Sequence, residues 1–129
     1  MRSFKPPGRS VLFLLTLVFG AGLFPAASTV LAHAVLLESS PALESTVAGP
    51  DVPIELRFNV RIDASRSRLT LIVPGGLAQP LRVLKQTSAD VLSSEALGLQ
   101  AGIYRLRWQV LASDGHITRG EILFTVTRS

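Results

Sequence analysis

The stretch Tyr104-Arg105-Leu106-Arg107-Trp108-Gln109-Val110 alternates strictly between apolar and polar residues. A period of two places successive side chains on opposite faces, so this run predicts a β-strand with one buried face. The same alternation recurs from Ile54 to Arg61 and from Ile122 to Thr127. No segment after residue 33 has helical periodicity, and the pattern therefore predicts an all-β domain. Weaker strand candidates lie at residues 34–38, 69–73, 81–85 and 91–94.

Turn-forming residues separate these runs about every ten residues, as expected for a sandwich of short strands. About seven strands of this kind predict an antiparallel β-sandwich of immunoglobulin-like size. Tyr104 and Trp108 lie on the same face of one strand, where aromatic side chains usually fill the core rather than bind a ligand. The turn signals are Ser39-Ser40-Pro41, Gly49-Pro50, Pro74-Gly75-Gly76, Gly98, Ala101-Gly102 and Asp114-Gly115.

The first 32 residues have the composition of a secretory signal peptide. A basic start is followed by an almost wholly apolar run over residues 11–23 and then by small residues, which is the order of an export signal. Gly20, Gly22 and Pro25 interrupt the apolar run, which disfavours an uncleaved membrane anchor. The sequence thus predicts a signal peptide over residues 1–32 and an exported, periplasmic domain over residues 33–129. Cleavage after Ala32 and cleavage after Ala34 both fit the small-residue rule.

Charge and cysteine content limit the kinds of partner. Residues 33–129 hold ten basic and nine acidic residues, a net charge of +1, which gives no support for a nucleic acid as partner. A cluster of Arg61, Arg66 and Arg68 is expected to form a solvated surface rather than a docking patch. The chain has no cysteine, so its core alone must hold the fold together.

The chain has only two histidines, His33 and His116. Cleavage after Ala32 would make His33 the first residue, with a free α-amine and an imidazole as two nitrogen donors. Asp114 and His116 are two residues apart, so both side chains project from the same face of extended backbone. Nitrogen and oxygen donors suit copper(II), and the lack of cysteine, with Met1 as the only methionine, disfavours copper(I). A zinc site is a weaker alternative, because an α-amine is an unusual zinc ligand.

These residues also have a simpler interpretation. Asp-Gly is a strong hairpin signal, and Asp114-Gly115 lies between two predicted strands, so the pair could serve only to turn the chain. His33 could equally be a histidine without a role near a cleavage site. Spacing alone leaves both interpretations open.

Four motifs in order resemble the CopC family of copper-binding proteins, over essentially the whole of residues 33–129. The resemblance implies a Greek-key β-sandwich that binds one Cu(II) ion per chain through an N-terminal histidine brace, here His33, Asp114 and His116. It also implies a carrier or buffer in copper homeostasis or resistance, without catalysis. The motifs are His33-Ala34-Val35-Leu36-Leu37-Glu38-Ser39-Ser40-Pro41-Ala42, Ile54-Glu55-Leu56-Arg57-Phe58-Asn59, Ala101-Gly102-Ile103-Tyr104-Arg105-Leu106-Arg107-Trp108 and Ser113-Asp114-Gly115-His116-Ile117-Thr118-Arg119-Gly120, with Phe124-Thr125-Val126 after them.

The chain departs from the family pattern in three places. It lacks the methionines of a second Cu(I) site, Val60 stands where an acidic residue is expected near the copper, and Ile117 often is a proline. Residues that surround the metal ligands orient them, so valine at residue 60 predicts an altered orientation of the ligand imidazoles or weaker copper binding. The resemblance further implies a separate CopD-like inner-membrane copper protein as partner. Four donors from one chain require no second subunit, so we expect a monomer. Two other functions stay open, an oxidative copper enzyme with a histidine brace and a metal-free structural β-sandwich.

Overall fold

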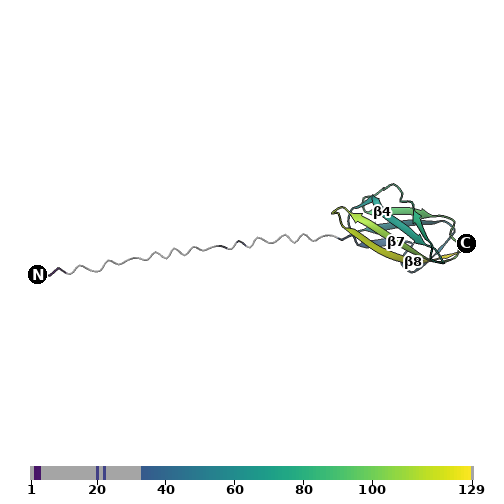
Figure 1. Ribbon diagram of the computed structural model, residues 1–129, viewed down its shortest axis with the longest axis horizontal. Coiled ribbons are helices and arrows are strands. Elements are labelled where there is room, and N and C mark those ends of the chain that lie inside the picture. The colour runs from purple at the N-terminus through teal and green to yellow at the C-terminus, as the bar shows by residue number, and fades with distance from the viewer. Residues whose placement is uncertain (1, 4–19, 21, 23–32, 129) are drawn as a thin grey trace.

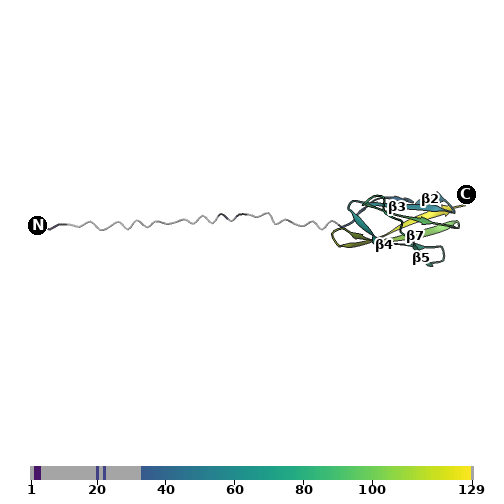
Figure 2. The same cartoon turned by 90° about the horizontal axis from the view of Figure 1, so that it is seen from above.

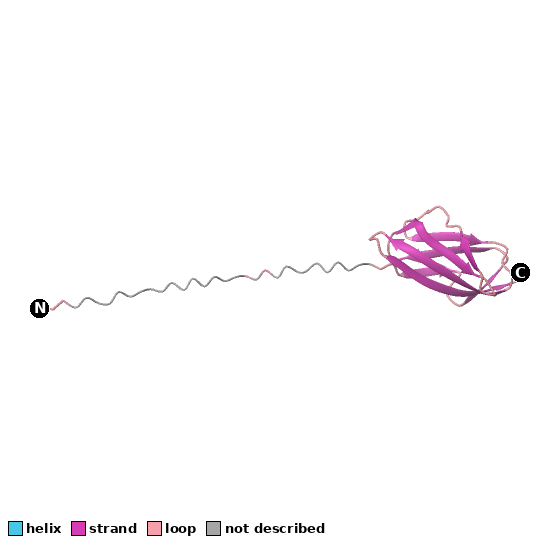
Figure 3. Cartoon of the chain, viewed as in Figure 1, coloured by secondary structure: helices cyan, strands magenta, loops and turns pink. Residues whose placement is uncertain are grey.

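The computed structural model describes residues 2–3, 20, 22 and 33–128. The predicted signal peptide and its cleavage site lie almost wholly outside these residues, so both stay predictions. Within the described part the chain forms strands and loops and no helix (Figure 3). None of the residues that the structure describes forms a helix long and apolar enough to cross a membrane.

Two sheets pack face to face as a β-sandwich (Figures 1 and 2). One sheet has three strands in the order β1-β3-β6, and the other has five in the order β2-β8-β7-β4-β5. The strands are β1 (Leu36–Ser40), β2 (Ser45–Ala48), β3 (Val52–Phe58), β4 (Ile62–Ile72), β5 (Ala78–Leu81), β6 (Val91–Ala96), β7 (Gly102–Ala112) and β8 (Ile117–Thr127).

The three runs with clear alternation become β3, β7 and β8, and the predicted sandwich is confirmed. Two details differ from the sequence prediction. The described residues form eight strands, because β2 adds a short strand, and β2 pairs parallel with β8 although an antiparallel sandwich was expected. The strand predicted over residues 81–85 is wrong, because β5 ends at Leu81. After Leu81 the chain crosses to the other sheet, where the Leu84 N–H donates to the Ser93 carbonyl.

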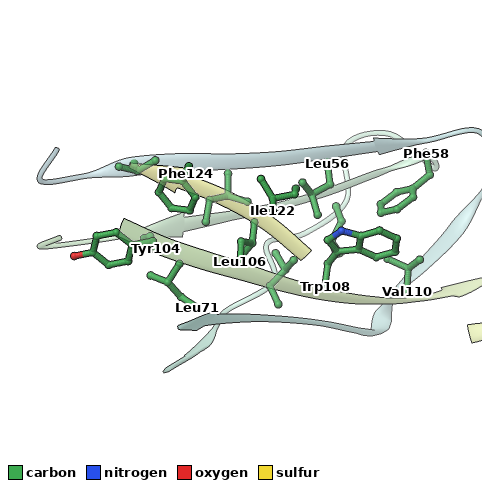
Figure 4. Packing of buried hydrophobic residues seen from close by; sticks show 14 of the residues in the cluster. Leu56, Phe58, Leu71, Tyr104, Leu106, Trp108, Val110, Ile122 and Phe124 are labelled. Atoms are coloured by element: carbon green, nitrogen blue, oxygen red, sulfur yellow. The ribbon is translucent and has the colours of Figure 1, made fainter. Parts of the chain in front are cut away.

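The inward-facing residues of β3, β7 and β8 fill the space between the sheets (Figure 4). Trp108 packs edge to face on Phe58, with ring centroids 5.2 Å apart, and Tyr104 stacks on Phe124 at 5.7 Å. Both Tyr104 and Trp108 are buried, at 3% and 7% exposure, as predicted for core residues. The buried hydrophobic cluster extends from Ala34 to Val126. The hydrophobic core of the described residues thus begins directly after His33.

Three segments meet at one end of the sandwich. They are the chain entering at His33, the β3–β4 connection over residues 59–61, and the β7–β8 hairpin over residues 113–116. The C-terminus lies at the opposite end of the sandwich (Figure 1). The fold thereby brings the beginning of the domain next to a hairpin some 80 residues later in the chain.

Candidate metal centre

The hairpin between β7 and β8 has a tight, well-defined shape. The Gly115 N–H donates to the Ala112 carbonyl at 2.9 Å, and the Ala112 N–H donates to the His116 carbonyl at 2.8 Å. Gly115 has a φ of +88°, a conformation that costs glycine little and other residues more. The Asp114 carboxylate accepts the His116 backbone N–H at 3.0 Å, as in an Asx turn. The Asp-Gly pair therefore does turn the chain, as its simpler interpretation required.

The same turn also brings the three predicted ligand residues together. The imidazole of His33 lies against that of His116, edge to face, with ring centroids 5.5 Å apart. Nδ1 of His116 lies 3.2 Å from Oδ2 of Asp114. A histidine at the start of the domain thus shares one small surface with an aspartate and a histidine from a distant hairpin.

The Asp114 carboxyl has a lowered pKa, which favours its ionised form. The His116 backbone N–H, which donates to the carboxylate, lowers the pKa of Asp114 below its ordinary value, and partial desolvation opposes this only in part. The nearby imidazoles of His116 and His33 act in the same direction when protonated. A carboxylate that stays ionised in mild acid suits a metal ligand, because a ligand must be deprotonated to bind.

One polar atom at this site lies near a carboxylate but makes no hydrogen bond of proper geometry with the described residues. The atom is Nδ1 of His116, which is buried beside Oδ2 of Asp114. A buried polar atom without a partner costs free energy and usually indicates a missing water, ion or ligand. This atom is the structural observation that fits a metal at the hairpin.

The side chains alone do not form a complete metal site. Among residues 33–128 no three histidine, cysteine, aspartate or glutamate side chains already cluster as a metal site would require. Two imidazoles and a carboxylate supply three donors, so a tetragonal copper(II) site would need a further one. While residues 1–32 remain attached, the nitrogen of His33 belongs to a peptide bond, so its amine can act as a donor only after cleavage before His33.

The β3–β4 connection contains Val60, already singled out from the sequence, and Asn59, for which the sequence predicted no separate role. Oδ1 of Asn59 accepts the Val35 N–H at 2.7 Å, and the Asn59 N–H donates to the Val35 carbonyl at 3.0 Å. Val60, where an acidic residue was expected, is half-buried and packs against the hydrophobic core. Ile117 is 53% exposed and begins β8 directly after His116.

Comparison with known proteins identifies relatives over nearly all of the described domain. Residues 36–127 match the family model described as the CopC domain. The chain is 33% identical over 109 residues to "Copper resistance protein C" of Xanthomonas campestris pv. juglandis, which covers 78% of this chain and 85% of that protein. It is 31% identical over 117 residues to "Copper resistance protein C" of Pseudomonas syringae pv. tomato, covering 84% and 91%.

Solved structures agree with this result. The crystal structure of CopC from Methylosinus trichosporium OB3b is similar with a TM-score of 0.67 and 28% identity, over 74% of this chain and 95% of that one. PcoC, described as a methionine-rich copper resistance protein from Escherichia coli, is similar with a TM-score of 0.62 and 29% identity, over 74% and 100%.

Proposed function

The chain belongs to the CopC family, and from that membership we propose that it binds one copper(II) ion and acts as a carrier or buffer in copper resistance. His33, Asp114 and His116 would hold the ion, with the amine of His33 as a further donor. The observation that carries the proposal is the contact between the His33 and His116 rings beside the Asp114 carboxylate.

The donor chemistry favours the oxidised ion. Two imidazoles, an amine and a carboxylate are nitrogen and oxygen donors, which suit Cu(II) in a tetragonal arrangement. Residues 33–129 contain no cysteine and no methionine, so they lack the sulfur donors that favour Cu(I). In this respect the chain differs from the methionine-rich relative PcoC.

The proposal includes export and cleavage before His33. Removal of residues 1–32 would free the amine, and release into the periplasm would place the site outside the cytoplasm. Intact mass measurement of the exported protein tests this step: the expected mass begins at His33, and a mass that begins at Val35 would remove the ligand. We further propose that the protein works as a monomer beside a separate CopD-like membrane protein.

A direct test is calorimetric titration of residues 33–129, beginning at His33, with Cu(II) at neutral pH. The expected result is uptake of one ion per chain, with much weaker uptake by His116→Ala. The matched control is Gln100→Ala, which removes an exposed side chain from the β6–β7 connection rather than from the proposed site. Absence of Cu(II) uptake by the parent protein, or equal uptake by His116→Ala, would contradict the proposal.

Two other functions are alternatives to a copper carrier, and the structure bears on the first of them. An oxidative copper enzyme needs open coordination positions and a surface for its substrate, often an aromatic one. Here Asp114 would occupy a position, and Tyr104 and Trp108 are buried in the core. Oxygen consumption or peroxide formation above that of free copper would support the enzyme. A metal-free structural sandwich would show no rise in melting temperature with Cu(II).

A further inference from the structure

We infer that the β3–β4 connection, residues 59–61, assembles the copper site before the metal arrives, and that Asn59 is its main positioning residue. The inference rests on the proposed copper function and adds to it a reason why the first residues of the domain are ordered. The site has two halves that are distant in the sequence. The first half is His33 at the start of the domain, and the second half is the hairpin with Asp114 and His116.

Asn59 holds the first half through two hydrogen bonds to a single residue. Its side-chain oxygen accepts the Val35 N–H at 2.7 Å, and its backbone N–H donates to the Val35 carbonyl at 3.0 Å. Both polar backbone groups of Val35 are thereby satisfied. The register between β1 and β3 shifts between Leu36 and Glu38, so the side-chain oxygen of Asn59 supplies an acceptor where regular strand pairing has been interrupted.

The residue between His33 and Val35 strengthens this attachment. Ala34 is 3% exposed and belongs to the hydrophobic core cluster, although it is only one residue from His33. A buried methyl group at residue 34 and a paired backbone at residue 35 fix the chain directly after His33. The start of the domain is therefore placed near His116 by these contacts rather than by the metal.

The same connection holds the second half of the site. The carbonyl of Arg61 accepts the Ser113 N–H at 3.0 Å, directly before Asp114. Regular pairing of β4 with β7 begins at the next residues, Ile62 and Ala112. The connection thus contacts the N-terminal segment through Asn59 and the ligand hairpin through Arg61, and its length sets the spacing between the two.

Preassembly has a measurable consequence for affinity. Apparent affinity falls in proportion to the fraction of molecules in the binding-competent arrangement. If the N-terminal segment were free, metal binding would also have to order it. Removing the Asn59 acceptor should weaken Cu(II) binding by about 3- to 10-fold, the effect of one typical hydrogen bond.

The test compares Asn59→Ala and Asn59→Asp with the parent, all as residues 33–129 beginning at His33. Asn59→Asp keeps an acceptor oxygen. The matched control is Asp51→Ala, because Oδ1 of Asp51 accepts the Gly98 N–H at 3.0 Å at the other end of β3. The measurements are Cu(II) affinity by competition with a chelator and hydrogen exchange of the Val35 amide without metal.

Asn59→Ala should bind Cu(II) more weakly and exchange the Val35 amide faster, without change in stoichiometry. Asn59→Asp should restore slow exchange and at least parental affinity, and Asp51→Ala should keep both parental values. Unchanged affinity in Asn59→Ala overturns the inference while leaving the proposed function intact. A parent protein that takes up no Cu(II) overturns the proposed function and the inference together.

Discussion

Gly120→Ala gives a stability prediction that follows directly from the packing of the core. Gly120 pairs with Trp108 across β7 and β8, and the indole ring lies over the glycine backbone. A Cβ at residue 120 would lie 2.5 Å from Cε2 and 2.8 Å from Nε1 of Trp108, and still closer to Cζ2. Carbon atoms in good contact are about 3.5–4.0 Å apart, so the added methyl group overlaps three ring atoms. Phe58 packs on the same ring at 5.2 Å, which leaves the indole little freedom to retreat.

Two opposing effects decide the magnitude. Alanine restricts the unfolded chain and would stabilise the protein by about 0.4–1 kcal/mol if it fitted. Overpacking a core by one methyl group costs about 1–3 kcal/mol. The clash should win, and we expect a net loss of about 1–2 kcal/mol. In a domain of this size the melting temperature should then fall by about 5–15 °C.

Thermal unfolding of the metal-free protein, followed by circular dichroism, measures this effect. Trp108→Phe supplies the control, because a smaller ring makes room for the methyl group. In the Trp108→Phe background Gly120→Ala should cost clearly less than in the parent, so the double-mutant cycle should show a coupling free energy. A melting temperature of Gly120→Ala equal to or above that of the parent would refute the packing described here.

Three further predictions concern a carboxylate, a buried hydroxyl and the copper site. The hydrogen bond from the Ser65 hydroxyl lowers the pKa of Asp63. At a pH above the ordinary carboxyl pKa of about 3.9, the ionised Asp63 side chain therefore stabilises the fold. This stabilisation is lost as the pH falls through the lower pKa of the folded state. Asp63→Asn should therefore be less stable than the parent in urea unfolding at pH 6, and this gap should close towards pH 2. Tyr104→Phe removes the hydrogen bond from the tyrosine hydroxyl to the Gln100 carbonyl. It should lower the free energy of unfolding by about 1 kcal/mol in the same urea assay. An unchanged free energy of unfolding would contradict a stabilising role for this bond. The Cu(II) affinity, measured by competition with a chelator, should fall as the pH is lowered, because protons compete with the metal for the amine and the imidazoles. An affinity that did not change with pH would argue against these ligands.

Regular alternation made much of the fold predictable from the sequence. The runs that became β3, β7 and β8 bury one face each, so their period of two is clear. The strand β2 has four residues and no large buried side chain, so its pattern carries no comparable signal. In β4 the pairing with β7 shifts between Asp63 and Arg68, and this bulge interrupts the alternation that would have revealed the whole strand.

The three candidate ligand residues could be proposed from the sequence, but the residues that position them could not. His33, Asp114 and His116 stand out because metal-binding side chains are few in this chain and because the hairpin spacing puts two of them on one face. Asn59 carries no such signal, since its effect depends on the register between β1 and β3 and on which backbone groups that register leaves unpaired. Contacts of this kind become visible only when segments distant in the sequence are placed together.

The central claim is that the free amine of His33 completes the copper site. The most direct measurement compares Cu(II) affinity between residues 33–129 beginning at His33 and the same protein with one added glycine before His33. The added residue converts the His33 nitrogen into an amide and leaves every described contact in place, and a glycine added after residue 129 serves as the control. We predict a large loss of affinity for the N-terminal addition alone, with a changed Cu(II) electron paramagnetic resonance spectrum. Equal affinities and identical spectra for the three proteins would contradict the account.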